Sequence, residues 1–145
     1  VIKFVLPFAW AASVNIRLGP SGKRLRLTPK YRKSKEAAHL RFLGQRPRGV
    51  HPEPGGWMLF FDFWWPDDSK GSTRDADNYV KMIKDALEDV IYLSDNSVKY
   101  HDAFVHGVSG EGRIEVNAAR VTQPLRDGFE NSDLIWNGRF KNETK

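Results

Sequence analysis

The sequence predicts an α+β fold, a single two-layer domain in which a mixed β-sheet carries its helices mainly on one face. Residues 57–65 are almost wholly apolar, and this run has the length of a buried strand. Residues 113–122 alternate between apolar and polar side chains, as a half-solvated strand does. Residues 28–43 and 77–90 have the apolar spacing of helices. Together these segments predict a sheet with helices packed against it.

The composition predicts one soluble domain. A chain of 145 residues with 40% hydrophobic residues can bury a core without metal or disulfide staples. We expect this domain over residues 1–123, followed by a polar C-terminal tail or extension over residues 124–145. The absence of cysteine excludes a disulfide framework, a thiolate nucleophile and Cys-ligated zinc. No apolar run is long enough for a membrane span, so we expect a cytoplasmic protein with no membrane partner.

The N-terminal third predicts a strand, a basic arm and a helix. Residues 1–8 are mainly apolar and end near a proline, which favours a strand. Residues 19–22 predict a turn, and residues 23–27 a short basic strand or hairpin arm. Thr28 and Pro29 are the residues expected at the N-cap and the first position of a helix, which we extend to Leu43 with Gly44 closing it. The apolar side of this helix would comprise Tyr31, Ala37, Ala38, Leu40 and Phe42.

Residues 45–56 are rich in proline and glycine and predict a loop, which leads into the apolar strand over residues 57–65 at the centre of the sheet. Asp62 is the single charged residue in this strand. A lone buried acid is costly unless it is paired or binds a metal. Its role can therefore be a structural hydrogen bond or part of a site.

The second helix begins at an acidic turn, with Asp77 or Asn78 as the expected N-cap, and runs to about residue 90. Its apolar stripe comprises Val80, Ile83, Leu87 and Val90. Lys81 follows Asp77 by four residues and so stands one turn along on the same face. We therefore expect Asp75, Asp77 and Lys81 to share one neighbourhood.

The last part of the domain predicts a turn and a hairpin. Asp95 lies in a turn that directly precedes a strand over residues 98–108. Residues 109–112, with two glycines, separate this strand from the alternating strand over residues 113–122. This pattern predicts that the two strands pair as a hairpin.

The net charge of +5 is unevenly distributed. Residues 17–48 contain eleven Lys or Arg and one acid, Glu36, whereas the remainder of the chain is net acidic. A basic arm on an acidic body is typical of a polyanion-binding protein, although it can also be a solvated charged face. The leading candidates for phosphate contacts are Arg17, Lys23, Arg24, Arg26, Lys30, Arg32, Lys33 and Arg74.

The acids around the second helix suggest a metal site. Asp75, Asp77 and Asp95 offer hard oxygen ligands, which suit Mg²⁺ or Mn²⁺ together with substrate phosphate. An Asp-x-Asp pair alone is weak evidence, because nucleotide enzymes and solvent-facing turns share it. The four histidines show no metal-ligand spacing, and no small-molecule cofactor motif is present. Two alternatives stay open here: a non-catalytic nucleic-acid-binding protein with a structural acidic cluster, and a metal-dependent nucleotidyl or glycosyl transferase.

Residues 74–87 and 91–98 resemble the RusA-type Holliday junction resolvases, a family of crossover junction endodeoxyribonucleases. The resemblance is carried by Asp75-Ala76-Asp77-Asn78, the following Lys81, the helix ending Asp85-Ala86-Leu87, and the turn Ser94-Asp95-Asn96-Ser97-Val98. Ser13-Val14-Asn15 and the stretch from Leu27 to Arg32 support it. The sequence departs from the family pattern at Ala76, at Ser94 and in the loop that carries Asp67 and Asp68. Asp67 and Asp68 stand where the family is often rich in arginine, so the DNA contacts and the junction selectivity of this loop should differ from those of the family.

This resemblance implies a small homodimeric nuclease that binds branched DNA, especially four-way junctions, and cuts symmetrically with Mg²⁺. It implies that Asp75, Asp77 and Asp95 bind the metal and that Lys81 is an essential cation. The corresponding chemistry is metal-assisted hydrolysis of a phosphodiester, in which Lys81 offsets negative charge on the scissile phosphate.

Overall fold

The computed structural model describes residues 1–13, 18–21, 24–68 and 74–121. Its main sheet has four strands in the order β1 (Ile2–Pro7), β6 (Arg113–Arg120), β4 (Trp57–Trp65) and β5 (Val98–Val108). β6 is antiparallel to β1 and β4, whereas β4 and β5 are parallel. The sheet is mixed, and the predicted α+β class is confirmed. The predicted tail over residues 124–145 lies outside the described residues.

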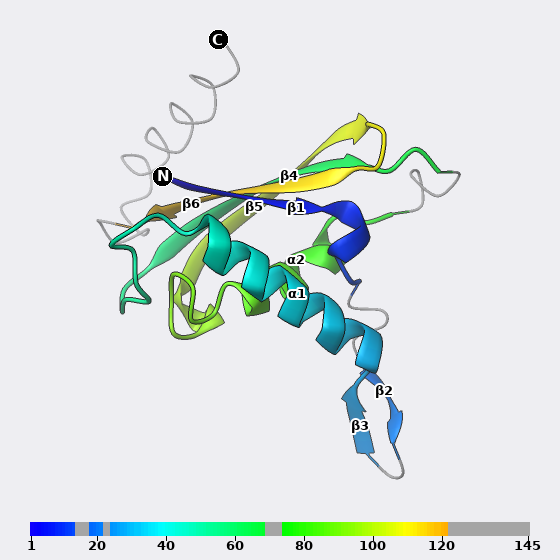
Figure 1. Cartoon of the computed structure of the whole chain (residues 1–145), viewed down its shortest axis with the longest axis horizontal. Coiled ribbons are helices and arrows are strands. Elements are labelled where there is room, and N and C mark those ends of the chain that lie inside the picture. Colours follow the sequence, from blue (N-terminus) through cyan, green and yellow to red (C-terminus); the bar gives the residue numbers. More distant parts are fainter. Residues whose placement is uncertain (14–17, 22–23, 69–73, 122–145) are drawn as a thin grey trace.

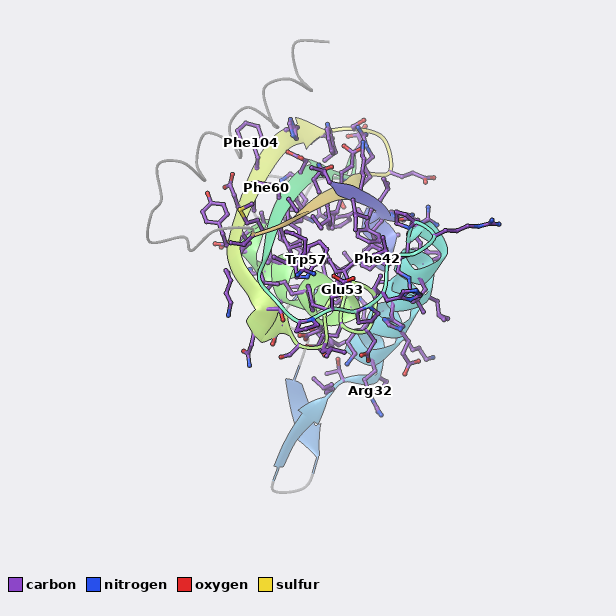
Figure 2. All side chains as sticks on the ribbon, turned by 90° about the vertical axis from the view of Figure 1, so that its left-hand side faces the viewer. Arg32, Phe42, Glu53, Trp57, Phe60 and Phe104 are labelled. Atoms are coloured by element: carbon purple, nitrogen blue, oxygen red, sulfur yellow. The ribbon has the colours of Figure 1, made fainter. Side chains whose placement is uncertain are left out.

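The two described α-helices, α1 (Pro29–Gln45) and α2 (Asp77–Ala86), lie on the same side of the sheet (Figure 1). β4 is the central strand, as predicted, because it pairs with a neighbour on each side. Alternate side chains of β4 and β6 point into the core and meet the buried side chains of both helices. In Figure 2, Phe42 lies on the helical side of the sheet, while Phe60 and Phe104 lie on the opposite face. None of the described helices is long and apolar enough to cross a lipid bilayer.

Helix α1 begins as predicted, with the Thr28 side chain accepting a hydrogen bond from the Tyr31 backbone N–H. The predicted end at Gly44 is wrong, because the helix continues to Gln45. The Gln45 side chain both accepts from Val5 N and donates to Val5 O, which ties the last turn to the edge of β1. Leu40, which we assigned to the packed side, is 68% exposed.

Helix α2 differs from the prediction at both ends. Its N-cap is Ala76, without a side-chain cap, rather than Asp77 or Asn78. It ends at Ala86, short of the predicted residue 90, and the following turn contains Asp89 with a left-handed φ of 63°. The predicted apolar stripe is nevertheless confirmed, since Val80, Ile83, Leu87 and Val90 are all buried.

The predicted hairpin between β5 and β6 is wrong, because β4 lies between these two strands. The connection at residues 109–112 passes over the end of β4, where Ser109 N donates to Trp65 O and Asp67 N donates to Gly110 O. Gly112 combines a φ of +75° with backbone atoms of residues 64–66 less than 3 Å from where a Cβ would lie. The glycine-rich turn therefore serves a close crossing of β4 rather than a direct hairpin.

The strands β2 (Leu18–Ser21) and β3 (Arg24–Leu27) form an antiparallel ribbon that extends away from the sheet beyond the start of α1 (Figure 1). This confirms the predicted arm in its backbone, but the predicted turn at residues 19–22 is wrong, because residues 19–21 pair with β3 as part of β2. Arg24 and Arg26 belong to β3, while Arg17 and Lys23 lie outside the described residues. At the base of the arm, α1 exposes Lys30, Arg32 and Lys33.

Asp62 lies in β4 and its Oδ1 is 2.8 Å from His106 Nε2 on β5. The His106 ring stacks on Trp64, with the ring centroids 4.3 Å apart. A buried strand can carry this acid because the histidine pairs with it. These contacts favour the structural role for Asp62.

Candidate active site

The turn that leads into α2 presents two acids to solvent. Asp75 and Asp77 are both exposed, and Asp75 Oδ1 accepts a hydrogen bond from Asp77 N at 3.1 Å. The Asp75 side chain therefore stabilises the turn before the helix, which explains why α2 begins without a capping side chain of its own. Both carboxylates remain at the surface, where a metal ion and a phosphate can reach them.

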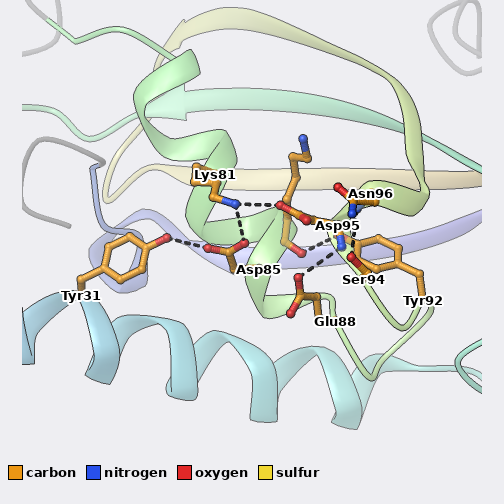
Figure 3. Close-up of polar contacts among 9 residues, drawn as sticks. Tyr31, Lys81, Asp85, Glu88, Tyr92, Ser94, Asp95 and Asn96 are labelled. Atoms are coloured by element: carbon orange, nitrogen blue, oxygen red, sulfur yellow. Dashed lines mark hydrogen bonds and ion pairs between the residues drawn. The ribbon is translucent and has the colours of Figure 1, made fainter. Parts of the chain in front are cut away.

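Lys81, one turn into α2, is bound by two other carboxylates (Figure 3). Its Nζ lies 2.7 Å from Asp95 Oδ2 and 3.0 Å from Asp85 Oδ1. Lys81 makes no ion pair with Asp75 or Asp77 among the residues that the structure describes. The structure thus joins two of the predicted site residues, Lys81 and Asp95, and adds Asp85 as a partner that the sequence analysis did not assign.

Asp95 reaches Lys81 because the chain folds back after α2. The Ser94 side chain caps a short 3-10 helix, η4 (Asp95–Ser97), by accepting from Asn96 N. Asp95 N donates to Glu88 Oε1 at 3.1 Å, which fixes the turn to the end of α2. Ser94, where the family pattern has an acid, therefore has a local capping role.

The charges of this cluster reinforce one another. The hydrogen bond from Lys81 lowers the pKa of Asp95 below its usual value, against the opposing effect of partial burial. Burial lowers the pKa of Lys81, but its hydrogen bonds to Asp95 and Asp85 outweigh this, so its pKa is raised. Both groups are therefore held in their charged forms. Nearby, burial raises the pKa of Tyr92, whose hydroxyl donates to Lys84 O.

The acids at the end of α2 have the chemistry of a hard-metal site. One carboxylate oxygen from each of Asp85, Glu88 and Asp95 lies within 4.8 Å of the others. Oxygen donors of this kind fit Mg²⁺ or Mn²⁺. Asp85 and Glu88 follow Lys81 by four and seven residues, a helical spacing that is visible in the sequence. The same spacing is common on solvated helix faces, so it did not identify them.

Arg74, predicted to contact DNA, binds other residues of the same chain. Its guanidinium binds Asp68 through two hydrogen bonds, of 2.7 and 2.6 Å, and lies over the Phe8 ring at 4.8 Å. The hydrogen bond to Asp68 raises the pKa of Arg74, so the cation is permanent. One of the acids by which this loop departs from the family pattern thus binds the arginine next to Asp75.

Comparison with known proteins identifies the family of the chain. No curated protein matches the chain. The model of the family described as endodeoxyribonuclease RusA matches residues 7–118, from the last residue of β1 into β6. The matched range includes Asp75, Asp77, Lys81, Asp85, Glu88 and Asp95. Since this match covers well over half of the chain, the protein belongs to the RusA endodeoxyribonuclease family.

Proposed function

We propose that this protein resolves four-way (Holliday) DNA junctions by symmetric, Mg²⁺-dependent hydrolysis of phosphodiester bonds, in DNA recombination and repair. The observation that carries the proposal is the 2.7 Å contact between Lys81 and Asp95. These are the expected cation and an expected metal ligand, and they come from separate elements of the fold. As a nuclease of cellular DNA, the protein would act in the cytoplasm.

In the proposed reaction, Asp75, Asp77 and Asp95 would hold Mg²⁺ or Mn²⁺; of these three, Asp95 alone belongs to the group of described acids whose oxygens lie within 4.8 Å of one another. The ion would supply an activated water and stabilisation of the leaving 3′ oxygen. Lys81 donates to a non-bridging oxygen of the scissile phosphate and so offsets the negative charge that builds there. Its ammonium is already held in place, so little reorganisation is needed when the phosphate arrives. No protein nucleophile is required.

The basic arm supports DNA as the substrate. It leaves the domain as a two-stranded ribbon, and the exposed cations Lys30, Arg32 and Lys33 continue its charge onto the first turn of α1. In Figure 2, Arg32 lies at the base of the ribbon. Such a projecting basic ribbon can follow a groove or a backbone at a junction arm. We therefore assign DNA binding to the arm and cleavage to the site residues around α2, which are Asp75, Asp77, Lys81 and Asp95.

Two symmetric cuts require two sites, so the proposed assembly is a C2 homodimer. The sheet has two edges, β1 and β5. The β1 edge is engaged within the chain, because Gln45 and Arg41 bond to the backbone of Val5. β5 instead exposes Val105 and Val108, at 43% and 55%. This contrast favours β5 as the dimer surface. The test is the oligomeric state of a Val105→Lys, Val108→Lys variant, measured by sedimentation.

The proposal is tested by incubating the protein with a synthetic four-way junction and a linear duplex of matched sequence. We expect paired nicks in the junction with Mg²⁺, binding without efficient cutting with Ca²⁺, and no cutting in EDTA. A non-catalytic binder would retain affinity for the junction and leave every strand intact. A transferase would bind or hydrolyse free nucleotides. Either result would contradict the proposal.

A further inference from the structure

The lysine of the candidate site lies in a chain of hydrogen bonds that begins on the other helix (Figure 3). Tyr31 Oη donates to Asp85 Oδ2 at 3.1 Å, and Asp85 Oδ1 lies 3.0 Å from Lys81 Nζ. Lys81 in turn contacts Asp95. Each oxygen of Asp85 therefore has its own partner, one on α1 and one on α2.

Tyr31 is a rigid anchor for this chain. Its side chain is fully buried in the core, and its backbone N–H is bound by Thr28, the N-cap of α1. Asp85 is only partly exposed, with 16% of its side chain accessible. A buried hydroxyl from one helix thus fixes the orientation of a carboxylate on the other, and the carboxylate can hold the long, flexible lysine side chain in one place.

We propose that Asp85, oriented by Tyr31, is a positioning residue that holds Lys81 in its productive place during DNA cleavage. This inference rests on the proposed function. An ion pair four residues apart on a helix needs no contribution from a second helix, so the buried tyrosine is the observation that goes beyond an ordinary surface pair. If Asp95 held a metal ion, Asp85 would be the other carboxylate that keeps the Lys81 ammonium in position.

The chain offers matched controls for both residues. Tyr92 is also fully buried and also donates its hydroxyl to α2, but to the backbone carbonyl of Lys84 rather than to Asp85. Asp89 lies four residues after Asp85, is exposed, and is not one of the two carboxylates that pair with Lys81 in the described part of the chain. Its left-handed φ is one that asparagine tolerates. Tyr31→Phe is therefore compared with Tyr92→Phe, and Asp85→Asn with Asp89→Asn.

Single-turnover cleavage of a four-way junction with Mg²⁺ gives the maximal rate and the half-saturating protein concentration for each variant. We expect Tyr31→Phe and Asp85→Asn to lower the maximal rate by about 10-fold or more, which is the usual effect of removing a group that orients a residue of a metal site. The half-saturating protein concentration should not change. Tyr92→Phe and Asp89→Asn should keep the wild-type rate, even where Tyr92→Phe lowers the melting temperature as much as Tyr31→Phe. Equal rates in all four variants, or equal reductions in the two tyrosine variants, would overturn the assignment.

A second measurement does not depend on activity. The ¹⁵Nζ resonance of the Lys81 ammonium reports whether this group is held by hydrogen bonds, with and without Mg²⁺. We expect it to stay ordered on Mg²⁺ addition in the wild-type protein and in Asp89→Asn, and to broaden in Asp85→Asn. An unchanged resonance in Asp85→Asn would contradict the positioning role. A wild-type protein that cuts no junction would contradict the proposed function instead, and the resonance would still decide the role of Asp85.

Discussion

The two ends of the candidate site are built in different ways. At the open end, Asp75 and Asp77 lie exposed in a turn that is stabilised by a side-chain hydrogen bond within the turn itself. At the closed end, Asp95 is joined to Lys81, and Lys81 to Asp85 and the buried Tyr31. Local backbone geometry therefore places the open end, while tertiary packing places the closed end. The same chemical change should have different consequences at the two ends.

The largest expected effect is the loss of cleavage when a metal-binding acid is replaced. The accompanying change in stability should differ between the two ends of the site. Asp75→Asn, Asp77→Asn and Asp95→Asn should each lower junction cleavage by more than about 100-fold, because even outer-shell partners of a metal contribute about 10- to 100-fold. Asp95→Asn should in addition lower the free energy of unfolding by up to about 1 kcal/mol, because its ion pair is removed. Asp75→Asn and Asp77→Asn should leave it unchanged. Cleavage gels and denaturant titrations measure the two quantities.

Asp67→Asn is the control for this series, since Asp67 is an exposed acid of the loop that follows β4. It should retain cleavage and stability. Wild-type cleavage by the Asp75 and Asp77 variants, together with abolished cleavage in a Glu88→Gln variant, would move the metal to the group formed by Asp85, Glu88 and Asp95.

The next largest effect concerns DNA affinity and lies outside both ends of the site. If the arm binds phosphates, the triple variant Lys23→Ala, Arg24→Ala, Arg26→Ala should flatten the plot of log affinity against log salt by about 0.9 for each phosphate that is no longer neutralised. At 0.1 M salt this corresponds to a decrease in affinity of up to about tenfold per phosphate. Saturating concentrations of the variant should restore cleavage, because the site residues around α2 are intact. An unchanged salt slope would show that the arm is a solvated ribbon.

The sequence predicted what depends on local pattern and missed what depends on tertiary contact. The strands and helices follow from apolar spacing, and the Thr28 cap from its residue type. The insertion of β4 between β5 and β6 could not be predicted, because a glycine-rich turn looks the same whether it closes a hairpin or crosses a strand. In the site, a local motif identified Lys81 and Asp95. The contact from Tyr31 to Asp85 spans 54 positions in the chain and leaves no local pattern.

A smaller effect is expected at the open end, where Asp68 holds Arg74. Asp68 occupies two of the five N–H donors of Arg74 and offsets its charge, so it competes with a DNA phosphate for this side chain. Asp68→Asn removes this anionic competitor, and because exposed pairs of this kind contribute about 1 kcal/mol or less, junction affinity should rise by a few-fold at most. Arg74→Gln should weaken binding. If Asp68→Asn weakens binding as much as Arg74→Gln, the pair acts by orienting Arg74 and not by masking it.

The smallest expected effect is the pH dependence of the closed end in metal-free protein. The pKa of Asp95 is lowered in the folded state, so its ion pair stabilises the fold above the unfolded pKa of about 3.9 and loses this contribution as pH falls through the folded pKa. The pKa of Lys81 is raised, so its contribution is present below about 10.4 and is lost as pH rises through the folded pKa.

These two pH ranges predict how the stability difference between wild type and Asp95→Asn depends on pH. Because asparagine resembles a protonated aspartate, the stability difference between wild type and Asp95→Asn should be greatest near neutral pH and should fall away at both extremes. With 35% of the Lys81 side chain exposed, solvent screens the pair, and the plateau should not exceed about 1 kcal/mol. In a Lys81→Met background, Asp95→Asn should lose most of this pH dependence, because the largest cause of the lowered Asp95 pKa is gone while Lys84 and the Asn96 backbone N–H remain. Denaturant titrations in EDTA from about pH 3 to about pH 11, a range that brackets both unfolded pKa values, measure the difference. A profile that persists in the Lys81→Met background would assign the stabilisation of Asp95 to a group other than this lysine.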